Sequence, residues 1–426
     1  MKAHAVHPAD PPPARQGAVA MATLLIAFAF AMPPDLVSYS AYAAAMLIAL
    51  GLYTVFFARD VLRALIFKEY LLFAGLALLY VGLSVFGVIR PAMRLSDPGA
   101  VLPQAAGLLL IIAALPAFTH AAGMIFLPRL RIVPFAAIML AVLLSITFWR
   151  DTENILIRGG VYGVRAPALL LHFLYFFVVL RISGNRGIRC LLLLLPLPLS
   201  GAASNALIQL ALAGLVLAGR PRQVLLALVA GLIALMLGLT YFLDTLRGIG
   251  LADPNVGIRS ILWRHAVESV ATHPLGIGYG SGWTDFQALR DPGIRHLYAF
   301  NLSRSLQIAN HSSFLDLPLR LGWLGLLLFA LMLRRLWRDC AQRPFALEAT
   351  AALFIVLVAA AFNPVIESAR SALFVALALG YMRATAMFAP ENAARAGKPL
   401  PDAFVPAISP RERRVALAAQ NGGAIL

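Results

Sequence analysis

The stretch VGIRSILWRHAVESVATHPLGIGYGSG, residues 256–282, is the longest polar interval between the apolar segments of this chain. A second short motif, ANHSS at residues 309–313, opens the next apolar segment. Together they collect ionisable side chains in one connecting region, namely Arg259, Arg264, His265, Glu268, His273 and His311. The sequence on either side is apolar over long runs, so we expect any reacting groups to come mainly from this region.

The composition is that of an integral membrane protein. Of the 426 residues, 61% are hydrophobic and 13% are charged, whereas soluble domains carry about 25% charged residues. Long continuous apolar runs indicate helices and lack the alternation of an outer-membrane barrel. The net charge of +16 is explained by basic cytoplasmic loops and by attraction to anionic lipid. The sequence contains no basic block of the kind that would indicate a nucleic-acid partner. The two cysteines, Cys190 and Cys340, indicate neither a disulfide framework nor a metal site.

The apolar runs predict an all-α, polytopic transmembrane bundle. At roughly 20 apolar residues per crossing, about twelve spans are expected, at 18–32, 36–57, 70–89, 101–127, 132–149, 166–182, 188–200, 204–219, 222–242, 312–333, 346–362 and 370–389. They fill a domain at 18–389, between a cytoplasmic N-terminal tail at 1–17 and a cytoplasmic, disordered C-terminal tail at 390–426. The span at 188–200 is short and holds two prolines, so a broken or re-entrant segment is an open alternative there.

Lys and Arg in the loops orient the chain, because cytoplasmic loops are enriched in both. With the N-terminus inside, every inside connection is basic, and these connections lie at 58–69, 128–131, 181–189, 219–223 and 334–343. The C-terminal tail is then cytoplasmic as well. The long loop at about 243–311, which holds the opening stretch, is placed outside the cytoplasm.

Arginine also occurs in the outside connections, where it works against the insertion bias. These arginines are Arg90, Arg94, Arg150, Arg158, Arg165, Arg247, Arg259, Arg264, Arg290, Arg295, Arg304 and Arg370. The planar fork of guanidinium donors suits phosphate. An anionic ligand handled outside would explain them, and pairing with carboxylates or lipid headgroups is the alternative.

The opening stretch predicts an amphipathic helix at the outer interface, between a start signal at Asp253-Pro254 and a stop near His273-Pro274. Its apolar positions recur at helical spacing, and its polar residues fall opposite. The apolar set is Ile258, Ile261, Leu262, Ala266, Val267 and Val270, and the polar set is Ser260, Arg264, His265, Glu268 and Ser269. Alternating glycines follow, at Gly276, Gly278, Gly280 and Gly282. They favour either a backbone nest for an anion or a plain flexible loop.

His311 stands at the mouth of the span that begins near residue 312. Its neutral imidazole can accept a proton near neutral pH, although a lone loop histidine is more often simply solvated. Asp316 and Arg320 lie deeper in the same predicted helix, at a spacing that favours mutual pairing.

The two motifs resemble those of the O-antigen ligase and polymerase superfamily. The residues that carry the resemblance are Arg259, Trp263, His273, Gly276, Gly278 and Gly280, followed by Asn310, His311, Ser312, Leu321, Gly322 and Gly325. A further likeness is the loop with Arg158, Gly159, Gly163 and Arg165. The resemblance covers roughly residues 150–335 in order and in topology.

The resemblance implies a GT-C-like enzyme of the bacterial inner membrane, with about twelve helices and a long periplasmic loop holding short amphipathic helices. Such enzymes transfer a glycan from undecaprenyl pyrophosphate to an acceptor hydroxyl, without a metal, a nucleotide sugar or another cofactor. Carried over by position, Arg259 would bind the donor pyrophosphate, and His311 would be either the base or the orienting group for the acceptor. Candidate substrate-binding residues are Arg264, Arg165, Arg158, Arg186, Asn310 and Gly278.

The sequence departs from the family pattern at two places. A Ser-Arg-Gly-like motif is expected two spans before the long loop, and the matching stretch carries Asn205 in place of the arginine. The alternative match holds Arg186, which falls inside on this topology unless 187–219 is one bent crossing. The second departure is Arg320, where the family often has Glu.

We therefore predict a polysaccharide ligase or polymerase with its active site in the periplasm and both termini in the cytoplasm. Its partners would be the lipid-linked glycan donor, the bilayer, and an acceptor that is either lipid A–core or a second lipid-linked glycan. The alternative is a polysaccharide transporter or lipid-linked glycan flippase, and transporters often show internal repeats that this sequence lacks.

Overall fold

The computed structural model describes residues 13–31, 39–64, 67–89, 101–127, 131–147, 166–197, 203–241, 254–280, 312–341, 346–363, 365–366 and 369–396. All regular secondary structure within these ranges is helical, which confirms the predicted all-α class. Residues 1–12 of the predicted N-terminal tail (1–17), residues 397–426 of the predicted C-terminal tail (390–426), and most of the long loop at 243–311 lie outside the described residues.

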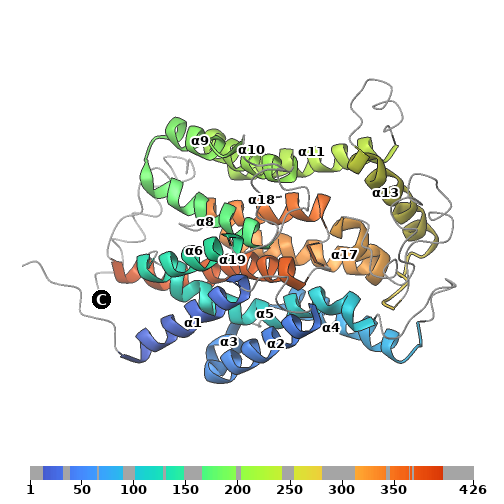
Figure 1. Ribbon diagram of the computed structural model, residues 1–426, viewed down its shortest axis with the longest axis horizontal. Coiled ribbons are helices and arrows are strands. Elements are labelled where there is room, and N and C mark those ends of the chain that lie inside the picture. The colour runs from blue at the N-terminus through green and yellow to red at the C-terminus, as the bar shows by residue number, and fades with distance from the viewer. Residues whose placement is uncertain are drawn as a thin grey trace, which may run out of the picture.

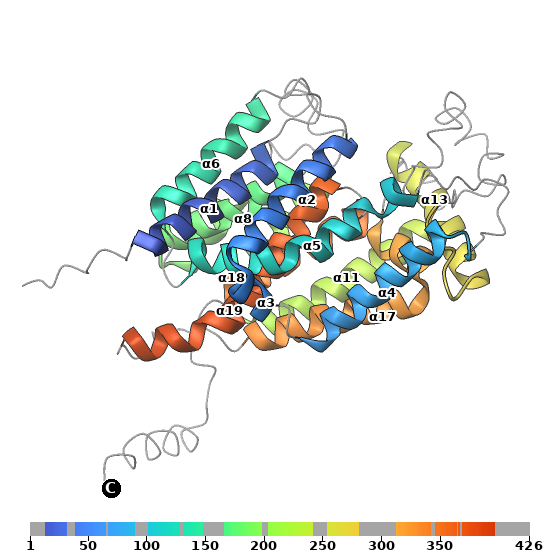
Figure 2. The same ribbon diagram turned by 90° about the horizontal axis from the view of Figure 1, so that it is seen from below.

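Most helices run along the long axis of the molecule, and α13 lies inclined at one end (Figures 1 and 2). The helices are α1 (Pro13–Ala31), α2 (Tyr39–Phe56), α3 (Ala58–Ala64), α4 (Lys68–Val85), α5 (Val101–Phe126), α6 (Ile132–Thr147), α8 (Ala166–Ile182), α9 (Arg186–Leu194), α10 (Ala203–Ala218), α11 (Pro221–Tyr241), α13 (Pro254–Thr272), α17 (Ser313–Cys340), α18 (Ala346–Phe362) and α19 (Ala369–Ala396). Helix α19 thus continues past residue 389, into the segment expected to be a disordered tail.

Four of the described helices, α4, α5, α11 and α17, are long and apolar enough to cross a membrane. A fifth candidate is the pair α2 and α3, if their bend of 106° belongs to a single span. Six shorter apolar helices occupy other predicted spans. The chain is an integral membrane protein, and the count of twelve crossings stays a prediction.

Within the predicted span at 188–200, α9 has only nine residues and extends about 14 Å, in keeping with the short or broken segment expected there, and residues 198–200 lie outside the described residues. The Tyr175 hydroxyl of α8 donates to the carbonyl of Leu192 in α9. A Cβ on Gly219, just after α10, would lie 2.5 Å from the Arg186 guanidinium. Therefore α9 and α10 form an antiparallel hairpin, and the alternative of one bent crossing over 187–219 is not supported.

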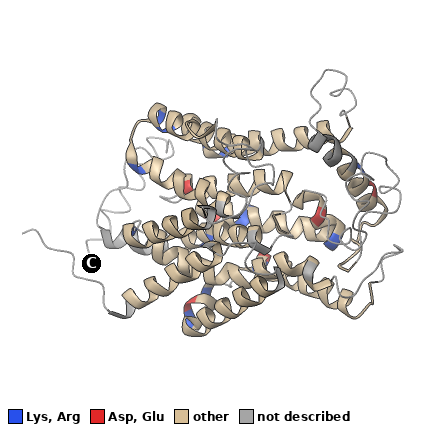
Figure 3. Cartoon of the chain, in the orientation of Figure 1, with Lys and Arg blue, Asp and Glu red and all other residues tan. Residues whose placement is uncertain are grey.

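Several basic residues lie at one end of the bundle, where α9 and α11 begin and α17 ends (Figure 3). Arg181 and Arg189 lie within electrostatic reach of Glu348 at the start of α18, and Glu69 at the start of α4 lies within reach of Arg335. We call this the basic end, and the opposite end, where α4 and α11 end and α17 begins, the clasp end. Described residues of the predicted inside connections at 58–69, 181–189, 219–223 and 334–343 therefore lie at this one end.

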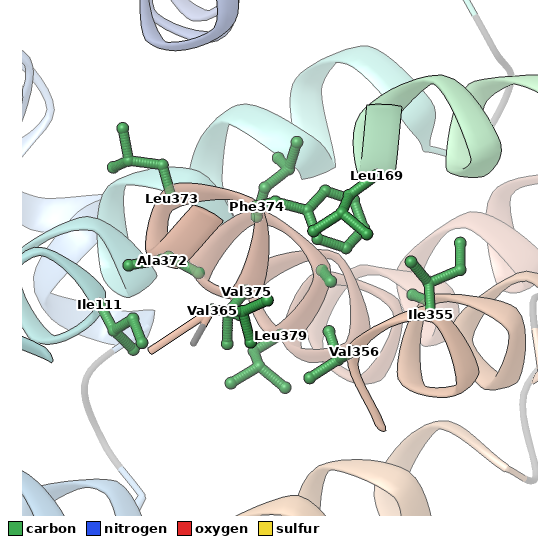
Figure 4. Close-up of a cluster of buried hydrophobic side chains, with 14 of the residues drawn as sticks. Ile111, Leu169, Ile355, Val356, Val365, Ala372, Leu373, Phe374, Val375 and Leu379 are labelled. Carbon is green, nitrogen blue, oxygen red and sulfur yellow. The ribbon is translucent and has the colours of Figure 1, made fainter. Parts of the chain in front are cut away.

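The centre of the bundle is the crossing of α5 and α19, which pack closely against each other. A Cβ at Gly380 would lie 2.8 Å from the backbone nitrogen of Thr119, so only glycine permits this approach. Apolar residues of α5, α8, α18 and α19 surround the crossing (Figure 4). This dry core fixes the long helices, and through them the polar segments at the clasp end.

Candidate active site at the clasp end

Helix α13 forms where its sequence predicts it. It begins at Pro254 and ends at Thr272, because proline suits the first helical turn and the residue before Pro274 is biased away from helix. The prediction of this helix and of its end is confirmed. The His273 amide still donates to the carbonyl of Ser269, so helical hydrogen bonding continues up to Pro274.

One face of α13 packs into the bundle instead of lying on its surface. Leu262, Trp263 and Ala266 are buried, and the Trp263 ring lies 6.0 Å from the ring of Phe362 at the end of α18. Ser260 is also buried, which corrects its assignment to the polar face. Position 259 precedes Trp263 by one turn of the same helix.

Arg264 is exposed on α13 and donates to the carbonyl of Thr240, at 3.4 Å, in the last turn of α11. A cation at a helix C-terminus stabilises the unpaired carbonyls there. On the same surface, His265 lies 3.4 Å from the carboxylate of Glu268. Arg264 therefore ties α13 to α11 as well as facing solvent.

The glycine-rich stretch after α13 is a structural connection. Residues 274–280, which we call the clasp segment, run along a break in α17. Backbone amides and carbonyls of the two segments pair with each other: Ile277 N–H donates to Leu319 O at 2.7 Å, Gly278 N–H to Arg320 O at 3.1 Å, and Trp323 N–H to Pro274 O at 3.0 Å. The pairing supplies donors to carbonyls that lose their helical partners at the break, because buried backbone groups need hydrogen-bond partners.

The other amides of the clasp segment are also bonded. Tyr279 N–H donates to the Ser84 hydroxyl at 2.9 Å, and Gly280 N–H donates to the side-chain oxygen of Gln104 at 2.8 Å. These bonds correct the anion-nest alternative for Gly278, because the amide donors that a nest would present already have protein partners. Neither Ser84 nor Gln104 was expected at the site.

Two glycines are required where the backbones touch. Gly276 has φ +83, and a Cβ there would lie 2.4 Å from the nitrogen of Gly322. Gly322 has φ +69 and breaks α17, and its Cβ would lie 2.6 Å from the carbonyl carbon of Leu275. A side chain at either position would separate the clasp segment from α17.

Arg320 is buried at the break. Its guanidinium donates to the carbonyl of Gly278 at 3.1 Å and lies over the Tyr279 ring, 6.0 Å from the ring centroid. Asp316 is buried one turn earlier on the same helix, and the pairing expected between these two residues stays a prediction.

The first residues of α17 are fixed to the connection between α18 and α19. The Ser313 hydroxyl donates to the carbonyl of Asn363 at 3.2 Å and accepts from the amide of Ile366 at 3.0 Å. Ser312, the N-cap residue, is fully buried. Since Phe362 also meets Trp263, the inward face of α13 and the start of α17 meet at the end of α18.

The structure brings together only part of the predicted site. Arg264, Gly278 and the helix position of Arg259 lie at the clasp end. Arg186 lies at the basic end, about 30 Å away along the 21 residues of α11. The remaining candidates, His311, Asn310, Arg158 and Arg165, lie outside the described residues, although His311 directly precedes the buried Ser312.

Most of the helices that meet at the clasp end belong to a stretch of sequence that matches a known protein family. Residues 188–330 match the O-antigen ligase family. The O-antigen ligase match takes in α9, α10, α11, α13, the clasp segment and the first part of α17, and it confirms the resemblance recognised from the motifs. It indicates glycan transfer of the ligase or polymerase type. A comparison with curated proteins found no match.

Proposed function

We propose that the protein is a membrane glycosyltransferase that moves a saccharide from undecaprenyl pyrophosphate to an acceptor hydroxyl, at the periplasmic face of the bacterial inner membrane. The match to the O-antigen ligase family supports the class of reaction. The proposal places the clasp end in the periplasm and the basic end in the cytoplasm, in agreement with the enrichment of Lys and Arg in cytoplasmic loops.

The observation that carries the proposal is the meeting of α13 and α17 at the end of α18. Trp263 packs on Phe362, and Ser313 bonds to the neighbouring Asn363. Position 259 is one turn from Trp263, and position 311 is two residues before Ser313. The proposal is that Arg259 and His311 act together, because α13 and the start of α17 are anchored to the same short connection.

The proposed transfer needs only the donor and the acceptor as reactants. The acceptor oxygen forms a bond to the anomeric carbon of the donor sugar, while the bond from that carbon to the pyrophosphate oxygen breaks. The pyrophosphate leaves with the electron pair, and the hydroxyl proton passes to the imidazole of His311. Arg259 stabilises the charge that develops on the leaving group, because preoriented donors act most strongly where charge develops. The proposed reaction uses no metal or other cofactor.

Further groups complete the phosphate and acceptor sites in this proposal. Arg264 donates one of its five N–H groups to Thr240, and its other donors are proposed to bind phosphate. A lysine at this position would keep the charge but lose the planar fork of donors. Arg158, Arg165 and Asn310 are the other proposed ligands. The proposal gives no ligand role to Arg186, whose guanidinium lies beside Gly219, or to Gly278, whose amide donates to α17.

The experiment is complementation of a strain that lacks its own copy. His311→Ala and Arg259→Lys should abolish normal glycan on gels at unchanged protein level, while Arg338→Lys, exposed at the basic end, should complement fully. Normal glycan with both site variants would contradict the assignment. In the deletion strain, full-length polymer left on its lipid carrier indicates a ligase, and single repeats attached normally indicate a polymerase. Precursors retained in the cytoplasmic leaflet would indicate a flippase instead.

A further inference from the structure

We propose that Arg320 is a positioning residue, which holds the clasp segment so that α13 keeps a fixed placement relative to the start of α17. This inference rests on the proposed function, because it concerns the alignment of Arg259 on α13 with His311 before α17. It assigns no contact with the substrate to Arg320.

The clasp segment transmits its position directly to α13. The helix ends at Thr272, and His273 is bonded backward to Ser269 and forward to Gly276. No unbonded residue therefore separates α13 from the clasp segment. Any displacement of the segment from α17 must tilt or shift the C-terminal turn of α13.

Arg320 contacts the clasp segment through both its backbone and its side chain. The backbone carbonyl of Arg320 accepts from Gly278 N–H, and its guanidinium donates back to Gly278 O. The same guanidinium lies over the Tyr279 ring, at a distance where a desolvated cation is attracted to the ring face. Arg320 is 7% exposed, so loss of its side chain leaves buried polar atoms without their donors.

Two other helices hold the same segment from the opposite side. The Tyr80 hydroxyl donates to Leu275 O, and the Ser84 hydroxyl accepts from Tyr279 N–H, both from α4. Gln104 at the start of α5 accepts from Gly280 N–H. If these side chains and Arg320 hold the same segment, the effects of removing them on stability and activity should not add, because residues in one network couple.

The first test is hydrogen exchange in the purified, full-length protein, which needs no substrate. Arg320→Ala should speed exchange of residues 276–280 at least about tenfold, since local opening sets the rate. The matched control, Arg338→Ala, removes an exposed arginine of the same helix and should leave the segment protected. Unchanged exchange in Arg320→Ala would overturn the proposal. Ser84→Ala is the milder second variant, should Arg320→Ala fold poorly.

The second test separates positioning from substrate binding. Arg320→Ala should lower kcat about 10–100-fold, because small misplacements are costly, and leave the donor KM within about threefold. Arg320→Lys should recover part of the loss. The double variant with Ser84→Ala should be little worse than Arg320→Ala alone. A raised donor KM in Arg320→Ala, with an inert Ser84→Ala, would show that Arg320 binds the substrate and would overturn positioning.

A failure of the proposed function can be distinguished from a failure of the positioning role of Arg320. If the proposed function fails, His311→Ala and Arg259→Lys would keep full transfer, whereas the exchange result for Arg320→Ala would still report on the clasp segment by itself. Loss of transfer in the His311 and Arg259 variants, with normal exchange and normal kcat in Arg320→Ala, would overturn only the positioning role.

Discussion

The ring of Trp263 in α13 lies 6.0 Å from the ring of Phe362, the last residue of α18. This contact joins the polar connecting region to the apolar core, because Phe362 is continuous with the buried face of α18. It explains why α13, which carries both polar and apolar residues, is held at a fixed place at the clasp end. The predictions below test the contacts that position this helix.

Trp263→Ala should detach α13 from the bundle. Removal of a fully buried aromatic side chain costs about 3–5 kcal/mol, and Trp263 is fully buried. We expect a lower midpoint of thermal unfolding in detergent and loss of glycan transfer. Trp263→Phe keeps an aromatic contact with Phe362 and should retain most of the activity. Equal behaviour of the two variants would contradict a packing role for this ring.

Gly322→Ala should destabilise the protein, because the residue has φ +69 and a Cβ there would lie 2.6 Å from Leu275. Strained backbone of this kind costs on the order of 1–3 kcal/mol. Gly231→Ala in α11 is the matched control, since a Cβ at that position meets nothing within 4 Å. It should be neutral or stabilising by about 1 kcal/mol. Thermal unfolding of the two variants side by side measures the difference.

Arg186 should be dispensable for transfer, because its guanidinium lies beside Gly219 at the basic end. Arg186→Ala should keep activity within about twofold of the parent, since surface changes away from special features have small effects. Activity reduced as far as in Arg259→Lys would show that Arg186 belongs to the site and would contradict the hairpin of α9 and α10.

Cysteine labelling tests which end of the bundle faces the periplasm. In a background with Cys190→Ser and Cys340→Ala, the thiol of Leu275→Cys should react with a membrane-impermeant maleimide on cells with a permeabilised outer membrane, because Leu275 is 78% exposed. The thiol of Arg186→Cys should react only after the inner membrane is opened. The reverse pattern would place the clasp end in the cytoplasm.

Ser313→Ala should weaken the attachment of α17 to the connection after α18. The hydroxyl both donates to Asn363 O and accepts from Ile366 N–H, and loss of a buried partner costs about 1–3 kcal/mol. Thermal unfolding and glycan transfer should both decline. Ser269→Ala on α13, a half-buried serine, is the control and should change neither by much.

Helix α13 and its end at His273-Pro274 could be predicted from the sequence, because apolar spacing and a proline act locally. The two prolines after Leu195 likewise predicted a short or broken segment where α9 lies, although the run of leucines from Leu191 has the composition of a span. The clasp segment was beyond prediction. Tyr279 of the segment and its partner Ser84 are 195 residues apart, and polar residues near the ends of apolar runs give no sign of which backbone groups they bond to.

The alternating glycines show how one pattern has two physical explanations. Positive φ at Gly276, Gly278 and Gly280 is equally suited to an anion nest and to a close backbone contact. The structure favours the close backbone contact, because the amides of Ile277, Gly278 and Gly280 already have acceptors. These acceptors are the carbonyls of Leu319 and Arg320 and the side-chain oxygen of Gln104. The charge bias of the loops already predicted that Arg186 and Arg264 lie on opposite sides, and the hairpin of α9 and α10 agrees with that separation.

The most direct test is transfer by the purified protein, reconstituted in lipid, from a polyprenyl-pyrophosphate-linked saccharide to an acceptor. The account predicts that the parent protein releases free polyprenyl pyrophosphate in step with product. His311→Ala should be slower by about 10²–10⁴-fold, as expected for loss of a positioned base, and Arg259→Lys should also lose most of the rate. Parental rates of product formation in both variants, at matched protein level, would contradict the central claim.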